Sequence, residues 1–183
     1  MTFNGGITPD LAPHLHPEYR PFGYIGNVQN VPGWAINGAV DYELLPNMFA
    51  LKVTVPPFTR FESLSLAING TGGTGSMQAA VYDASTMLPI AASLKQANFY
   101  KWSGFQYVSL NGYGDPSAVA RDVWAVFTCD AQGGKLPMVM PHLPGIDFIG
   151  SKCFSTSELT ELPVRLDFAG WQQEGRIPLI AMK

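Results

Sequence analysis

The stretch Met48-Phe49-Ala50-Leu51-Lys52-Val53-Thr54-Val55 decides the fold class of this 183-residue chain. Every second residue from position 49 is apolar, while Lys52 and Thr54 take the opposite face. Successive side chains of a strand point to opposite faces, so this period of two predicts a half-buried β-strand. Pro56 and Pro57 follow directly and end the strand, because proline has no backbone N–H to donate.

The same period recurs and predicts further strands over Phe61–Ile68, Met77–Asp83 and Pro163–Phe168. Two more strands are predicted at Gln106–Leu110 and, as the closing strand, at Ile177–Met182. The side chains expected to face inward are Leu64, Leu66 and Ile68 in the first and Met77, Ala79 and Val81 in the second. Val164, Leu166 and Phe168 are expected on one face of the strand at Pro163–Phe168.

The segment Asp122–Cys129 is apolar at nearly every position, which predicts a central strand that is buried on both faces and carries Trp124. Helical signal is limited to single turns at Asp115–Ala120 and Ser155–Leu162. About eight short strands with connections rich in glycine and proline predict an all-β, antiparallel β-sandwich of the jelly-roll type. This domain is expected to span residues 36–183.

Residues 1–35 differ from the rest and are predicted to form an extended N-terminal arm. Prolines recur through the arm and exclude a helix: Pro9, Pro13, Pro17, Pro21 and Pro32. Its apolar side chains are too numerous for a solvated linker: Leu11, Leu15, Tyr19, Phe22 and Tyr24. We expect the arm to lie against another surface, either its own domain or a neighbouring subunit.

Composition narrows the class of function. Charged residues make up 14% of the chain, well below the ~25% that is usual, and such a surface suits a subunit inside an assembly. The net charge is −3 and the basic residues are scattered singly, so we expect no nucleic-acid partner. No secretion signal and no apolar run of membrane-spanning length occur, so we expect no membrane partner and synthesis in a cytoplasm.

The residue types that carry catalysis do not form a recognisable site. His14 and His16 have no third ligand at a metal-binding spacing, and the run Gly70–Gly75 fits a hairpin turn better than a phosphate cradle. Cys129 and Cys153 show no metal spacing, and whether they pair is left open. Asp83, Asp115, Asp122 and Asp130 are expected at strand ends and turns, where aspartate satisfies local backbone donors. We therefore predict no catalytic, cofactor-binding or metal-binding residues, no cofactor, and a structural or binding module that is not an enzyme.

Aromatic residues are the remaining candidates for a binding surface. Tyr100 and Trp102 stand in a polar connection, and Tyr113 follows a predicted strand. Exposed aromatic rings next to polar groups can stack on sugars or anchor a protein interface. Packing in the core or at its rim is the alternative for all three.

Several of these stretches, taken together, resemble β-sandwich modules of bacteriophage virion proteins, which occur in tail fibres and accessory head proteins. The stretches that carry the resemblance are Pro57–Leu66, Met77–Ala84, Met87–Ile90, Tyr107–Leu110 and Asp122–Phe127. The resemblance covers roughly residues 50–183. The chain departs from it at Ile90, where glycine is frequent, and at Val123, where tyrosine usually precedes the tryptophan. It implies a virion component, often a trimer, and no shared catalytic residues.

Three functions follow as hypotheses. The first is a capsid decoration (cement) or accessory head protein that binds neighbouring subunits, such as the major capsid protein, through its N-terminal arm. The second is a tail-fibre or tail-tip module that recognises host surface glycans through exposed aromatic residues. A carbohydrate-active enzyme on the same sandwich is the third. We favour the first, with the virion as the location and a homo-oligomer as the assembled form.

Overall fold

The structure is a computed structural model that describes residues 40–43, 47–69, 75–112, 117–130, 135–139, 142–143, 146–147, 152–157, 161–178 and 180–182. The predicted arm, residues 1–35, lies outside these ranges together with its candidate residues Leu11, Leu15, Tyr19, Phe22 and Tyr24. Tyr113 and most of the glycine-rich run at 70–75 also lie outside them.

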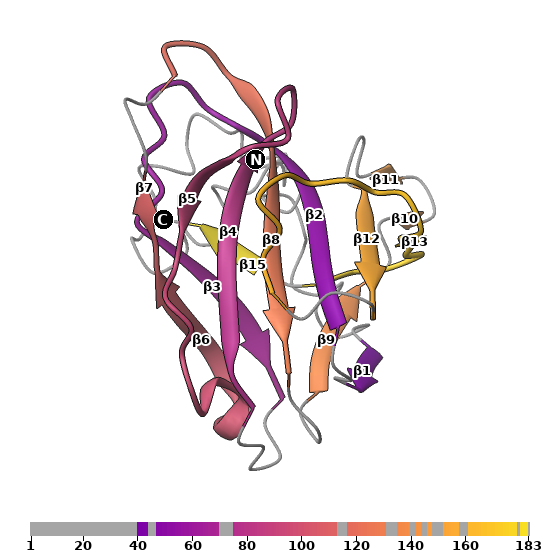
Figure 1. Cartoon of the computed structure of the whole chain (residues 1–183). Helices are drawn as coiled ribbons and strands as arrows, with labels where there is room; N and C mark the ends of the chain where they lie inside the picture. The colour runs from indigo at the N-terminus through magenta and orange to yellow at the C-terminus, as the bar shows by residue number, and fades with distance from the viewer. Residues whose placement is uncertain are drawn as a thin grey trace, which may run out of the picture.

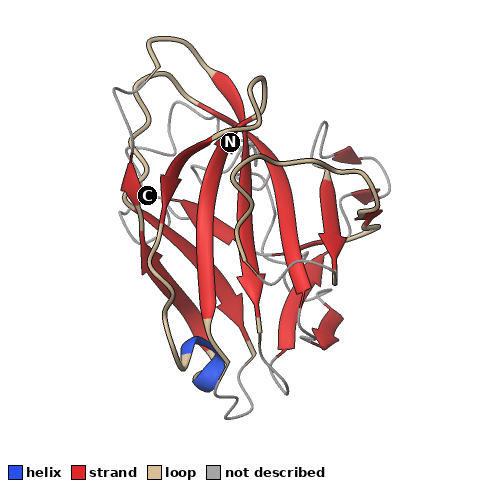
Figure 2. Ribbon diagram, in the orientation of Figure 1, coloured by secondary structure: helices blue, strands red, loops and turns tan. Residues whose placement is uncertain are grey.

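The described residues form an antiparallel all-β sandwich, as the sequence predicts (Figures 1 and 2). The larger sheet has seven strands, in the order β13 (Gln172–Gln173), β12 (Cys153–Thr156), β2 (Asn47–Val55), β8 (Arg121–Cys129), β4 (Met77–Asp83), β5 (Pro89–Ala92) and β7 (Asn111–Gly112). The middle strand β8 is the segment predicted to be central, and its neighbours β2 and β4 coincide closely with the predicted strands.

Smaller sheets complete the sandwich. One consists of β15 (Ile180–Met182), β3 (Ser63–Ile68) and β6 (Gly104–Ser109), and Figure 1 shows β3 and β15 crossing behind the larger sheet. A second consists of β1 (Val40–Glu43), β9 (Lys135–Val139) and β14 (Ile177–Pro178), while β10 (His142–Leu143) pairs with β11 (Ile146–Asp147). The 3₁₀ turn η4 (Phe99–Lys101) precedes β6.

The strand pairs are nested around one hairpin. β4 pairs with β5, β3 pairs with β6 outside that hairpin, and β2 pairs with β8 outside both. Successive pairs alternate between the larger sheet and the β15–β3–β6 sheet. A long hairpin rolled up in this way is the jelly-roll-like feature that the sequence predicts.

An inner apolar layer fills the space between the sheets. The predicted inward residues of β2, β3 and β4 all lie in it, and the rings of Phe49 and Phe127 stack at a centroid distance of 5.2 Å. Cys129 and Cys153 are buried in this layer and are not joined by a disulfide. They lie opposite positions 47 and 51 of β2, and four residues of strand span ~13 Å, beyond the reach of a disulfide.

An outer apolar layer lies on the opposite face of the larger sheet. Met48, Ala50, Tyr82, Trp124 and Val126 point into it. Residues 161–171, which we call the strap, cover this face as an irregular segment that also contributes apolar side chains: Leu166, Phe168 and Trp171. Figure 1 shows the strap as the gold ribbon in front of β2 and β8.

The prediction of a strand at Pro163–Phe168 is wrong, because this segment belongs to the irregular strap. Leu166 is buried, but Val164 is 85% exposed, so the alternating side chains do not share one face. No described strand pairs with this segment, which is instead held in place by individual hydrogen bonds. The Tyr82 hydroxyl donates to Pro163 O at 2.6 Å, and the Leu166 amide donates to Met87 O at 2.9 Å.

Three further predictions are corrected. Ser155 and Thr156 belong to strand β12 rather than to a helical turn. The closing strand at Ile177–Met182 is divided between β14 and β15, which lie in different sheets. Residues 117–120 form a bend instead of a helical turn, because the Ser117 hydroxyl is bonded to the backbone of Val119.

Candidate functional site

Of the candidate binding residues, Tyr100 takes the alternative that the sequence left open, packing in the core, and its role as a binding residue is corrected. The 3₁₀ turn η4 directs its ring into the core, where it is fully buried and meets Phe99 edge-on at 5.2 Å. Its hydroxyl donates to Thr128 O at 3.3 Å. Burial raises the pKa of Tyr100 well above its ordinary value, and the ring is closed to a ligand.

Trp102 is exposed, as the binding hypothesis requires. Its side chain is 64% exposed, and Lys101 Nζ lies 5.2 Å from the ring centroid, within cation–π range. Tyr107 on β6 is equally exposed. Tyr100 is buried and Tyr113 lies outside the described residues. Of the three predicted aromatic residues, Trp102 is therefore the one that the described residues show to be exposed.

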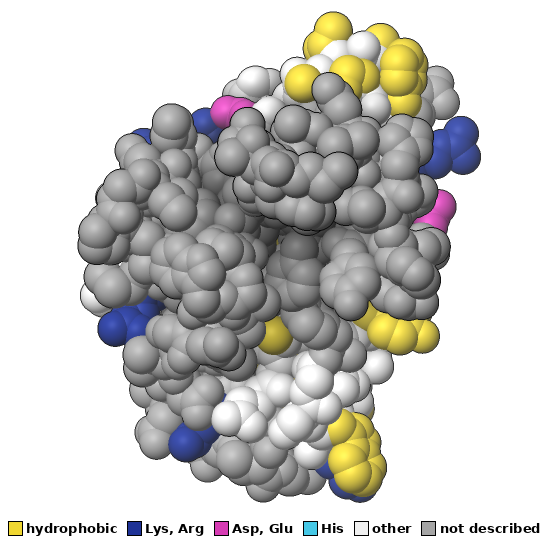
Figure 3. Space-filling view, turned by 180° about the vertical axis from the view of Figure 1, so that it is seen from behind, with side chains coloured by type: hydrophobic (Ala, Val, Ile, Leu, Met, Phe, Trp, Pro, Cys, Tyr) yellow, Lys and Arg dark blue, Asp and Glu magenta, His cyan; other side chains and the backbone are white. Residues whose placement is uncertain are grey.

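The larger exposed apolar group lies at the opposite end of the sandwich. We call it the apolar tip: residues 56–58, between β2 and β3, and residues 118–120, before β8. All six residues are exposed, and the side chains of Phe58 and Val119 are each 68% exposed. Figure 3 shows hydrophobic side chains gathered at the upper end of the molecule, and neither segment contains a charged residue.

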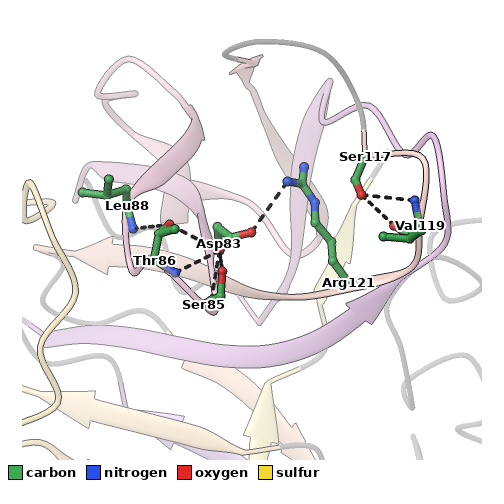
Figure 4. A network of polar contacts seen from close by, with 7 residues as sticks. All are labelled: Asp83, Ser85, Thr86, Leu88, Ser117, Val119 and Arg121. Atoms are coloured by element: carbon green, nitrogen blue, oxygen red, sulfur yellow. Dashed lines mark hydrogen bonds and ion pairs between the residues drawn. The ribbon is translucent and has the colours of Figure 1, made fainter.

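Hydrogen bonds hold the two segments of the apolar tip together. The Phe58 amide donates to Ser117 O at 2.7 Å and joins the segments. The Thr59 hydroxyl donates to Pro56 O at 2.7 Å, and the Ser117 hydroxyl donates to Val119 O at 2.8 Å while accepting from the Val119 amide at 3.2 Å (Figure 4). Specific bonds therefore join the two segments and order the backbone within each of them.

Phe58 has an unusual backbone. Its φ is 60°, in the left-handed region, where a side chain with a Cβ costs about 1–2 kcal/mol. Met87 and Asn98 are the other described non-glycine residues with positive φ. Asparagine tolerates this region, and Met87 packs in the outer layer, whereas Phe58 has neither compensation.

The carboxylates near the tip are tied to local partners. Asp83 Oδ1 accepts from the amides of Ser85 and Thr86 at 2.9 and 3.0 Å, and Arg121 Nη1 lies 3.7 Å from Asp83 Oδ2 (Figure 4). The hydrogen bond from the Ser85 hydroxyl, above all, lowers the pKa of Asp83. The predicted turn role of Asp83 is confirmed.

Asp122 and Asp130 also lie at the ends of a strand, but their predicted local role is wrong, because their partners are distant in sequence: Lys52 and Thr54 for Asp122, and Ser76 and Lys95 for Asp130. Lys52 Nζ lies 2.7 Å from Asp122 Oδ2, and this contact lowers the pKa of Asp122. Partial burial raises the pKa of Asp130, but bonds from Ser76 and Lys95 outweigh it and lower the pKa overall. A general acid at neutral pH needs a raised pKa, so these three carboxylates cannot donate protons there.

The remaining reactive groups are a buried thiol and the side chains that could bind a metal ion. Burial raises the pKa of Cys153, which leaves its thiol protonated and a poor nucleophile. Among the described residues, no group of three or more His, Cys, Asp or Glu side chains could bind a metal ion. No helix within the described ranges is long and apolar enough to cross a bilayer.

Comparison with known proteins adds no relative. No protein-family model matches the chain, and no curated protein sequence matches it either. The choice of Phe58 and Val119 as candidate site residues therefore depends on the geometry of the structure alone. The sequence offered one signal for Phe58, an aromatic residue directly after the Pro56-Pro57 stop, and none for Val119.

Proposed function

We propose that the chain is a structural subunit of a bacteriophage virion, a capsid decoration (cement) or accessory head protein that binds neighbouring subunits. The observation that carries the proposal is the apolar tip, an exposed, hydrogen-bonded and uncharged group at one end of the sandwich. Contiguous exposed apolar groups mark interaction sites, whereas scattered ones need no explanation.

The tip is not needed to complete the fold. The inner and outer layers are formed by other residues, and neither Phe58 nor Val119 belongs to them. A stable domain that presents apolar side chains outside its core suits a subunit whose surface is completed by another protein. The N-terminal arm is proposed as a second contact to the same neighbours.

Immunogold electron microscopy of purified virions tests this proposal. Antibody raised against the chain is expected to label the head at regular positions. Label confined to the tail would favour the receptor-binding alternative, and the absence of label from all particles would overturn the virion assignment.

Exposed Trp102 is the observation that favours the second candidate, a tail module that binds host glycans. Trp102→Ala is then expected to abolish adsorption to host cells while the thermal midpoint stays unchanged. Tyr107→Ala serves as a matched control because its ring is equally exposed on a different element. Normal adsorption by Trp102→Ala would exclude this candidate.

A further inference from the structure

We propose that Phe58 is the anchor of the subunit contact, and that its ring inserts into an apolar pocket on a neighbouring virion protein. The inference rests on the proposed function, since it names the residue and the partner surface through which the chain would join the particle. It depends on three observations: the backbone of Phe58, the bonds that fix it, and the charges around it.

The backbone observation indicates that Phe58 is retained at the expense of stability. Glycine would adopt φ 60° without strain, and the exposed ring contributes no contact to either apolar layer. Strained backbone conformations are concentrated at functional sites, where surrounding bonds hold them in place, as the bond from the Phe58 amide to Ser117 O does here. The strained residue at the tip is thus best explained by something that the ring does outside this chain.

The bonds at the tip indicate a preorganised anchor. The Phe58 amide is bonded to Ser117 O, and Pro56 and Pro57 have no amide hydrogen, so burying this segment leaves few donors unsatisfied. A side chain already fixed in its bound conformation loses little entropy on binding. Central aromatic residues of this kind carry most of the energy of many protein interfaces.

The charges argue for a protein pocket over a bilayer. Arg60, two residues after Phe58, is exposed and has no ion pair with a described residue, whereas Arg121 is paired with Asp83. Binding to an anionic membrane usually requires several free cations as well as apolar side chains, and the chain as a whole is negative. We expect the pocket to have an apolar floor and a carboxylate at its rim that faces Arg60.

The size of the tip argues against a second copy meeting it tip to tip. Six residues present far less than the ~800 Å² that each partner buries in a stable interface. A small convex group gains most by entering a concave site, where its whole surface is enclosed. The remaining contact area would come from other parts of the chain.

Binding of purified chain to virus particles that lack it tests the inference. Phe58→Gly removes the ring and relieves the backbone strain, so its thermal midpoint should be equal to or a few degrees above that of the wild type. Its affinity for the particles should fall about 30-fold, the effect expected of an interface anchor. Phe58→Asn, which also tolerates positive φ, should bind equally weakly.

Leu94→Ser is the matched control, since Leu94 is 81% exposed and lies outside the apolar tip. Its binding should equal that of the wild type. Wild-type affinity in Phe58→Gly would overturn the anchor while leaving the proposed function intact, and a lowered thermal midpoint would show that the ring serves the fold. Failure of the wild-type chain to bind particles would overturn both proposals. Cosedimentation that depends on Phe58 with phosphatidylcholine–phosphatidylglycerol vesicles would replace the protein pocket with a lipid surface.

Discussion

The two faces of the seven-stranded sheet carry apolar layers that are built differently. The inner layer is enclosed by strands of the smaller sheets, which bury Leu64, Leu66 and Ile180 against it. The outer layer is covered by the irregular strap, and Trp124 Nε1 in that layer is buried with no acceptor among the described residues. The difference shows that an apolar sequence pattern predicts that a face of the sheet is buried, but does not predict which segment covers that face.

The largest expected effect is in the inner layer. Leu51→Ala should lower the free energy of unfolding by about 4 kcal/mol, because a rigid sandwich of strands cannot collapse into the cavity. Urea denaturation followed by tryptophan fluorescence measures the change. Val164→Ala, at an exposed position of the strap, should leave the midpoint unaltered.

The same substitution in the outer layer sharpens the comparison. Leu166→Ala should cost about 3 kcal/mol or less, because the strap can relax towards the sheet. The variant should also be cut within the strap by a protease under native conditions, since local opening precedes global unfolding. A cost equal to that of Leu51→Ala with no local cleavage would show that the two layers form one cooperative unit.

Alkaline pH should weaken the outer layer through Tyr82. Burial raises the pKa of Tyr82 from 10.0 to about 12, so the unfolded chain releases this proton first. The free energy of unfolding should therefore fall as the pH rises from 10 to about 12, by roughly 2–3 kcal/mol from this group. Denaturation midpoints across this range test the sign, and the decline should be smaller in Tyr82→Phe.

The smallest effect concerns the bond between Tyr82 and the strap. At neutral pH, Tyr82→Phe removes the 2.6 Å hydrogen bond to Pro163 O and should cost about 1 kcal/mol. Hydrogen exchange at the Leu166 amide should accelerate more than exchange in β8. Equal acceleration in both would contradict a local role for this bond.

The strands could be predicted from the sequence where segments with alternating apolar and polar residues also pair with neighbouring strands. β4 was predicted with its bounds at Met77–Asp83 and with the correct inward residues. The strap has a similar alternation, but no described strand pairs with it. The sequence pattern alone does not show whether a partner strand is present. β12 was missed because Cys153–Thr156 is short and mixes polar with apolar residues.

The candidate site was harder to predict because exposure depends on local backbone geometry. Tyr100 stands among polar residues in the sequence, yet one 3₁₀ turn buries it. An aromatic residue such as Phe58 is ordinarily expected in the core, yet a left-handed backbone and a hydrogen bond to Ser117 accompany its exposure. Trp102 is exposed, and a binding role for Trp102, Tyr113 and the arm stays a prediction.

The nested pairing of the strands has a consequence for synthesis of the chain. Thr54 of β2 pairs with Asp122 of β8, 68 residues further on, and Leu51 lies opposite Cys153 of β12. At ribosomal rates of ~5–20 residues per second, β2 waits about 3–14 seconds for its first partner in the sheet. During that time it is an unpaired apolar strand, which is the form most prone to join another nascent chain. The yield of folded protein should therefore depend on how well β2 is shielded while the rest of the sheet is still being made.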